Sequence, residues 1–155
     1  MHQNTNIRIA STDDLERIVA LENLCFPKEF AYTRRQFRYF LMKANSTVLV
    51  ETTEMLIRGF IIILYRRGTT VAGIETINVD PIHRKKGIGL QLLSATEKLL
   101  RKKGIHKIRL EVSTTNHAAI KLYKNAGFKK IALLKKYYYY DHEGSRDAIR
   151  MVKEL

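Results

Sequence analysis

The first third of the chain shows one strand pattern followed by two helix patterns. Residues 7–10 alternate apolar and polar positions and predict a first strand. Ser11 follows as an N-cap with acids in the first turn, and apolar residues recur at helical spacing over residues 15–25, which predicts a helix. Residues 33–36, Thr-Arg-Arg-Gln, form a capping-box pattern, so a second helix is predicted with its apolar side at positions 37–41.

The middle of the chain has the pattern of consecutive strands. Residues 47–51 and 56–66 are apolar runs separated by a short polar segment, which predicts a β-hairpin. A second turn at residues 67–68 leads into a strand that ends at Asp80. Three strands joined by tight turns predict an antiparallel meander.

The second half alternates helices and strands. Apolar residues at helical spacing predict helices over residues 88–100 and 116–126. Alternation predicts strands over residues 106–113, 128–134 and 147–152. The order indicates a mixed α/β (α+β) fold, with a largely antiparallel central sheet of about seven strands flanked by about four helices.

Length and composition agree with this fold class. The chain has 155 residues, 45% of them hydrophobic, and no repeat or linker, so we expect one domain over residues 1–155. The single cysteine, Cys25, excludes an internal disulfide framework, and no Cys and His cluster has metal-ligand spacing. Residues 1–6 lack a signal-peptide pattern, and the most apolar run, residues 60–65, is too short to span a bilayer. We therefore expect a cytoplasmic protein without membrane contact.

The charge is strongly positive, with 28 Lys and Arg against 15 Asp and Glu and a net charge of +13. Such a field attracts phosphate groups, acidic peptides, nucleic acid or ribosomes, and it does not select among them. Ribosome association is therefore possible, but the composition predicts no specific nucleic-acid site.

The most informative stretch is a strand, a basic glycine loop and a helix start over residues 75–93. Asp80-Pro81 ends the strand, because proline has no N–H and fixes its own φ. The loop Arg84-x-x-Gly87-x-Gly89 then opens a helix, whose first N–H groups have no partner within it and favour an anion. The spacing is neither that of a Walker loop nor that of a dinucleotide fingerprint. The stretch predicts a pyrophosphate-binding loop; taken alone, the hexapeptide equally fits a basic turn that starts a surface helix.

The loop and two later segments resemble one enzyme family. Residues 84–89 are similar to the coenzyme A signature of the GNAT acetyltransferases. Residues 109–128, R-L-E-V-S-T-T-N-H-A-A-I-K-L-Y-K-N-A-G-F, resemble the next motif of the protein N-terminal acetyltransferases, and the tyrosine-rich end resembles their closing hairpin. The resemblance runs in order over residues 75–152 and is nearest to ribosomal-protein-alanine and archaeal N-terminal acetyltransferases.

The resemblance implies a GNAT-like fold, acetyl-CoA as cofactor, and direct transfer of the acetyl group to the α-amino group of a protein or peptide N-terminus in a ternary complex. The cofactor-binding residues that it implies are Ile77, Asn78, Val79, Arg84, Lys85, Lys86, Gly87, Ile88, Gly89, Leu90, Asn116 and Tyr123. It also implies that the aromatic run near Tyr138 and Tyr139 clamps the acceptor.

Two carboxylates and one phenol are the candidate catalytic groups. Glu111 lies on the polar face of its strand, just before the helix that carries Tyr123, which places a base and an acid close together. An α-amine, with a pKa near about 8, needs less help to become a nucleophile than a lysine near about 10.4. Glu75, on the preceding strand, is a rival base, and the N–H of Val79 is the expected oxyanion donor. Tyr123 also fits a simple core position.

The acceptor side is less determined by the sequence. The loop over residues 28–32 is expected to form a substrate-facing wall with Phe30 and Tyr32, and Glu75 completes the substrate-binding set. The loop reads F-P-K-E-F-A-Y-T, where the bacterial enzymes usually have a Trp-Ser pair, and the hairpin carries four tyrosines. Two alternatives stay open: an acceptor that is a small amine or a lysine side chain, and a basic ribosome- or RNA-binding module without turnover. We expect a monomer or weak dimer.

Overall fold

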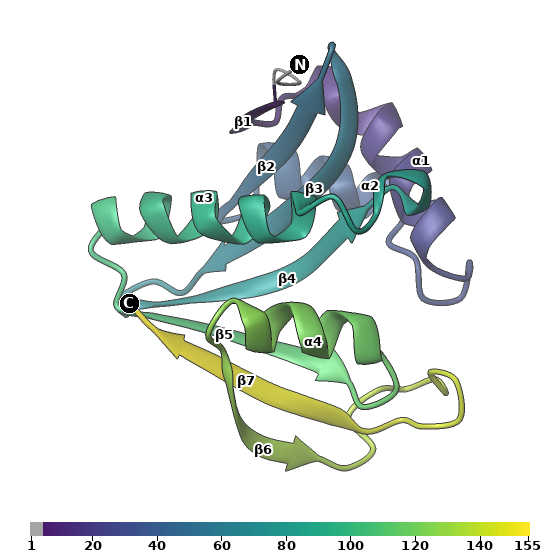
Figure 1. Ribbon diagram of the computed structural model, residues 1–155, viewed down its shortest axis with the longest axis vertical. Coiled ribbons are helices and arrows are strands. Elements are labelled where there is room, and N and C mark those ends of the chain that lie inside the picture. Colours follow the sequence, from purple (N-terminus) through teal and green to yellow (C-terminus); the bar gives the residue numbers. More distant parts are fainter. Residues whose placement is uncertain (1–4) are drawn as a thin grey trace.

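The computed structural model describes residues 5–155, which form one seven-stranded sheet with helices on both faces (Figure 1). The strands are β1 (Thr5–Ile9), β2 (Ser46–Thr53), β3 (Leu56–Tyr65), β4 (Val71–Val79), β5 (Lys107–Ser113), β6 (Lys129–Leu134) and β7 (Ala148–Glu154). The helices are α1 (Leu15–Cys25), α2 (Arg34–Met42), α3 (Ile88–Lys102) and α4 (His117–Asn125), with short 3-10 turns η1 (Thr12–Asp14) and η2 (Pro81–His83). The predicted fold class is confirmed.

The sheet order is β1-β2-β3-β4-β5-β7-β6, and every neighbouring pair is antiparallel except β4 and β5. These two parallel strands pair only at residues 71–73 and 107–109. Beyond those residues they diverge, and Figure 1 shows the gap opening between β4 and β5 toward the end of each strand. The gap separates a part made of β1–β4 from a part made of β5–β7.

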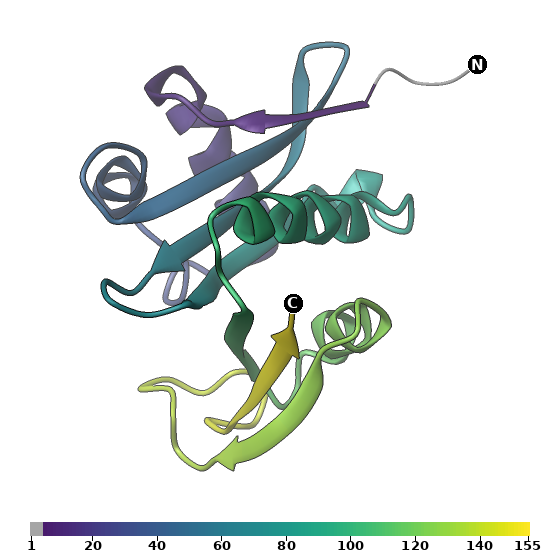
Figure 2. The ribbon, with the colours of Figure 1, turned by 90° about the vertical axis from the view of Figure 1, so that its left-hand side faces the viewer.

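The two faces of the sheet are covered unequally. On the first part, α1 and α2 pack on one face against Phe60 and Ile62, and α3 packs on the other against Ile61 and Ile63. On the second part, α4 packs on the same side as α3, against the buried face of β5 that carries Leu110. Figure 2 shows α1 and α2 on one side of the sheet and α3 and α4 on the other. The opposite face of β5 is the polar one.

Local signals set most of the element ends. Thr33 and Gln36 form the predicted capping box of α2, with the Thr33 N–H donating to Gln36 Oε1 at 2.7 Å. Gly104 follows α3 with φ +74°, a conformation that glycine adopts at low cost. Across residues 5–155, the structure contains no helix of the length and apolar character that a membrane crossing requires.

Candidate active site

The open edge of β4 presents backbone groups to the gap. The Asp80 N–H donates to the Arg58 carbonyl of β3 at 2.8 Å. Because backbone groups of a strand alternate in direction, those of Asn78 also face β3, whereas those of Ile77 and Val79 face the gap. A ligand between β4 and β5 therefore meets the backbone of Ile77 and Val79. The side chain of Asn78 instead donates a hydrogen bond to Glu22 of α1.

The N-terminus of α3 opens at the end of the same gap. Gly87 has φ +81°, in the left-handed region, and no side chain caps the helix. The first intrahelical bond runs from the Gln91 N–H to the Gly87 carbonyl at 3.0 Å, so the N–H groups of residues 88–90 precede it and have no helical partner. A Cβ at Gly87 would meet no atom within 4 Å. The helix start is open and fits a phosphate group.

The basic loop contributes both charge and structure. Lys85 and Lys86 are exposed beside the helix start. Arg84 instead turns back: its Nε donates to the Val79 carbonyl at 3.2 Å, and its Nη2 lies 3.4 Å from Cys25 Sγ. Arg84 therefore ties the loop to the end of β4, a role that the sequence did not indicate.

Two predicted cofactor residues also hold α4 in place. Gly89 lies on the first turn of α3, where an added Cβ would come within 3.0 Å of Leu122 on α4. Its missing side chain allows α3 and α4 to approach closely. Asn116 caps α4, with its Oδ1 accepting from the Ala119 N–H at 3.2 Å. The exposed Leu90 lies next to Gly89 on α3.

Glu111 lies on the polar face of β5, opposite α4. Its Oε1 accepts a hydrogen bond from Arg150 Nε at 2.9 Å and lies 3.4 Å from Arg109 Nε. Arg150 comes from β7, where it is the direct register partner of Glu111. Both guanidinium contacts are made to Oε1, so Oε2 is the oxygen that we expect to face a water or an amine.

Glu75 lies across the gap from Glu111. It is the bulged residue of β4, because Ile74 and Thr76 pair with consecutive residues of β3 and Glu75 has no partner there. A bulge re-aims a side chain out of the regular strand pattern. Glu75 is exposed and accepts a hydrogen bond from the Tyr32 hydroxyl. Continuing the register of β4 and β5 places Glu75 level with Glu111.

Tyr138 lies near these carboxylates, and Tyr123 of α4 lies near Tyr138. Burial raises the pKa of Tyr123, with Tyr138 acting in the same direction, and its ring packs edge-on against Phe128 at 5.6 Å. Burial also raises the pKa of Tyr138 to about 12, helped by Tyr137 and by the charges of Glu111 and Glu75. Both phenols therefore keep their protons at neutral pH.

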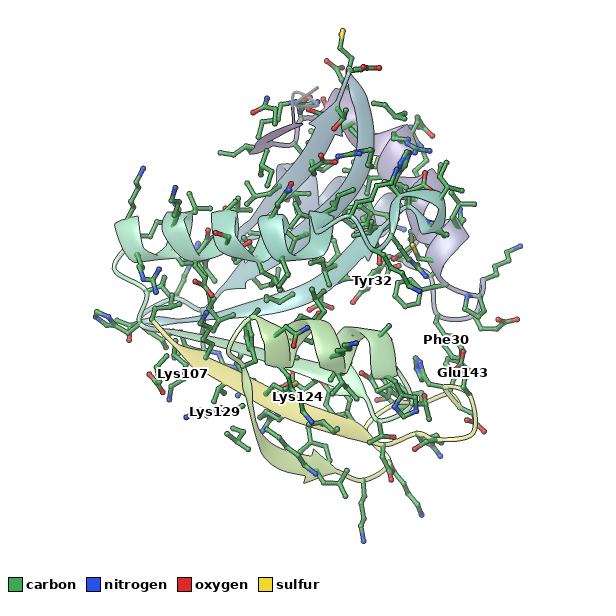
Figure 3. All side chains as sticks on the ribbon, viewed as in Figure 1. Phe30, Tyr32, Lys107, Lys124, Lys129 and Glu143 are labelled. Carbon is green, nitrogen blue, oxygen red and sulfur yellow. The ribbon has the colours of Figure 1, made fainter. Side chains whose placement is uncertain are left out.

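Two loops meet over the acceptor side of the gap. Phe30, in the loop between α1 and α2, stacks on His142 of the loop between β6 and β7, with ring centroids 4.1 Å apart. Tyr138 lies against the same His142 at 4.2 Å. Figure 3 shows Phe30 beside Glu143 of the second loop, with Tyr32 further along the first. The predicted substrate-facing loop, residues 28–32, therefore contacts the tyrosine-rich loop between β6 and β7.

A buried carboxylate anchors the substrate-facing loop. Glu22 of α1 is 1% exposed and accepts from Asn78 Nδ2 at 2.7 Å and from the Tyr32 N–H at 3.1 Å. Burial raises the pKa of Glu22. Glu22 thus links the strand that faces the gap to the loop whose tyrosine holds Glu75.

The structure brings together most of the predicted acceptor residues, with one exception. Tyr139 is 91% exposed and lies outside the cluster, whereas Tyr137 packs against Tyr138 with ring centroids 5.0 Å apart. Sequence reasoning also passed over Arg150, and it gave Arg109 no role beyond an ion pair with Glu111. Arg109 shares the polar face of β5 with Glu111, which the alternation shows; the position of Arg150 depends on the pairing of β5 with β7, which no local pattern reveals.

Comparison with known proteins gives consistent results. The model of the acetyltransferase (GNAT) family matches residues 15–128. The N-alpha-acetyltransferase of Saccharolobus solfataricus is 30% identical, over 96% of this chain and 92% of that protein. The ribosomal protein bS18-alanine N-acetyltransferase of Escherichia coli is 39% identical over 52% of this chain and 53% of its own length. The crystal structure of Ard1 from Thermoplasma volcanium superposes with a TM-score of 0.86 at 28% identity, covering 97% of each chain.

Proposed function

Because the chain belongs to the acetyltransferase (GNAT) family and is an acetyl-transferring enzyme, we propose that it acetylates the free α-amino group of a protein or peptide N-terminus and takes the acetyl group from acetyl-CoA. One observation carries this proposal: the open start of α3 and the free edge of β4 lie at one gap, and two carboxylates flank that gap on the acceptor side. The N-alpha-acetyltransferase relative supports an N-terminal acceptor.

The donor side follows from the backbone. Acetyl-CoA supplies the acetyl group as a thioester. The N–H groups of residues 88–90, with Lys85 and Lys86, would hold its diphosphate. The backbone groups of Ile77 and Val79 would bind its extended arm in the gap, and the Val79 N–H would stabilise negative charge on the acetyl oxygen.

The acceptor side follows from the side chains. Glu75, held by Tyr32 through one oxygen, would bind the incoming amine with the other. Glu111, held by its arginines at Oε1, would accept the amine proton at Oε2, directly or through a water. Tyr123 would donate its hydroxyl proton to the departing sulfur. The net charge of +13 fits an acceptor at the ribosome, and ribosomal proteins are one candidate substrate class.

A matched set of acceptors tests the function. A short peptide with a free N-terminus and one lysine is compared with the same peptide carrying a blocked N-terminus, and with spermidine, by following thiol release from acetyl-CoA. We expect transfer to the free N-terminus alone. Transfer to the blocked peptide or to spermidine would instead support a lysine or small-amine acceptor. No transfer to any acceptor class would overturn the proposal.

Gly87→Ala is expected to weaken acetyl-CoA binding by about tenfold, measured by isothermal titration calorimetry. An L side chain at φ +81° costs about 1–2 kcal/mol, and relaxing this strain turns the first N–H groups of α3 away from the phosphate. Gly68→Ala is the matched control, because Gly68 has φ +72° and equally open space in a distant turn. Both variants should lose stability, but only Gly87→Ala should lose affinity. Equal affinity losses would contradict a special role for the loop.

The pH profile is expected to rise and then stay level. Below about pH 8 the acceptor amine is protonated, so kcat/KM should rise with pH until that proton is lost. Because the pKa of Tyr123 is raised above the ordinary value for tyrosine, its hydroxyl keeps the proton throughout this range, and no fall should follow before about pH 10. The measurement is kcat/KM for one peptide from pH 6 to 10. A fall between pH 8 and 9.5 would show that Tyr123 is not the acid.

A further inference from the structure

Two arginines share one carboxylate on the acceptor side of the gap. Arg109 and Arg150 both contact Glu111 Oε1, through their Nε atoms at 3.4 and 2.9 Å. Their side chains keep 37% and 28% of their surface exposed. Glu111 therefore balances one of the two guanidinium charges. The next carboxylate, Glu75, accepts a hydrogen bond from Tyr32 and is assigned to the incoming amine, so one guanidinium charge remains for another partner once an amine is bound.

The arginines lie within the proposed acceptor site. Burial raises the pKa of Tyr137; Glu111 and Glu75 act in the same direction, and Arg150 and Arg109 act against them. All four charged side chains therefore lie near one tyrosine of the loop between β6 and β7. Arg109 pairs with Gly73 at the last paired position of β4 and β5, which is the closed end of the gap.

The distance along β4 from Glu75 to the level of Arg109 corresponds to one or two residues of an acceptor chain, and Arg150 is the register partner of Glu111, level with Glu75. Glu75 lies two residues beyond Gly73 along β4, which is roughly 7 Å at the rise of a strand. An amine bound at Glu75 therefore places the side chain of its own residue, or of the next one, near Arg109 and Arg150. A guanidinium carries five N–H donors in a planar fork, and the contacts to Glu111 engage the Nε of each arginine. The Nη groups are suited to a second carboxylate.

We propose that Arg109 and Arg150 form a subsite for an acidic side chain, so that this enzyme prefers protein N-termini with Asp or Glu among their first two residues. This subsite rests on the proposed function, since it requires an N-terminal acceptor bound at Glu75. Glu111 is the internal counter-charge of the subsite and holds the two guanidinium groups in place when no acceptor is bound.

Peptide pairs that differ only by Glu against Gln at position 1, 2 or 5 test the subsite. The readout is the ratio of kcat/KM for the Glu and Gln peptides within each enzyme, because a ratio cancels any general loss of turnover. The unaltered enzyme should favour Glu by about tenfold at position 1 or 2, the gain expected of one charge-assisted hydrogen bond, and show no preference at position 5.

Four variants locate the preference. Arg109→Gln and Arg150→Gln should each lower the ratio to near one. Arg101→Gln removes the same charge from an exposed position of α3 on the other face of the sheet, and it should leave the ratio unchanged. Glu111→Gln should increase the ratio even as turnover falls, because the guanidinium groups lose their internal counter-charge. A structural role for the arginines would move none of these ratios.

The outcomes separate the subsite from the function on which it rests. If no peptide is acetylated, the proposed function fails. If peptides are acetylated with equal kcat/KM for Glu and Gln at all positions, the function stands and the subsite is wrong. If Glu is preferred equally at positions 1, 2 and 5 and the arginine variants keep that preference, the overall positive field is responsible and the subsite is again wrong.

Discussion

The Glu111→Gln enzyme is expected to turn over its peptide acceptor about 100-fold or more slowly than the unaltered enzyme, with a small change in the peptide KM. A positioned general base contributes about 10²–10⁴-fold to a rate, and an amide does not accept the amine proton. Glutamine keeps the shape of the side chain and an oxygen for the arginines, so β5 and β7 should remain paired at this position. The measurement is kcat at saturating acetyl-CoA.

The matched control is Glu75→Gln, since Glu75 faces the same gap from β4 and contacts Tyr32 rather than an arginine. Its loss should raise the KM of the peptide more than it lowers kcat, because we assign it to binding the amine. Acetyl-CoA affinity should be unchanged in both variants. The opposite pattern, with kcat lost in Glu75→Gln and kept in Glu111→Gln, would move the role of base to Glu75.

Local signals in the sequence are enough to predict the strand end and the helix start on the proposed donor side. Asp80-Pro81 ends β4 and starts η2, because proline fixes its own φ and has no N–H to donate. Gly87 opens α3, because glycine adopts a positive φ at low cost. The proposed anion site would consist of backbone N–H groups at a helix start, so its position follows from the helix boundary alone. The helix boundary says nothing about where a loop side chain points, so the sequence did not show that Arg84 turns back onto Val79.

The acceptor side depends on contacts between distant residues, and most of it was beyond prediction. Arg150 reaches Glu111 only because β7 inserts between β5 and β6, and these residues are 39 positions apart. Glu75 faces the gap because of a bulge, which breaks the period-two rule used to assign faces. The loop that carries Tyr137 and Tyr139 is irregular, so neither the helical nor the strand period indicated which ring points inward.

The Arg58→Met protein is expected to lose about 3–5 kcal/mol of unfolding free energy, the largest stability effect that we expect from one substitution. Arg58 is 4% exposed and donates two hydrogen bonds, at 3.0 and 2.6 Å, to Glu51, which is fully buried. The substitution leaves that carboxylate buried without its charge partner. Arg58 is also a bulged residue of β3, because its neighbours Ile57 and Gly59 pair with the consecutive residues Thr52 and Glu51. Urea unfolding measures the loss.

Arg34→Met is the matched control for this prediction, since it makes the same substitution in a different setting. Arg34 and Glu16 form an ion pair at 2.7 Å in which both side chains are more than half exposed. Water screens such a pair, so its loss should cost less than about 1 kcal/mol. Adding Glu51→Leu to Arg58→Met should recover much of the stability, because the orphaned charge is then gone. If Arg58→Met cost no more than Arg34→Met, the Glu51 carboxylate would have to reach water, and the buried pair would not hold the β2–β3 hairpin together.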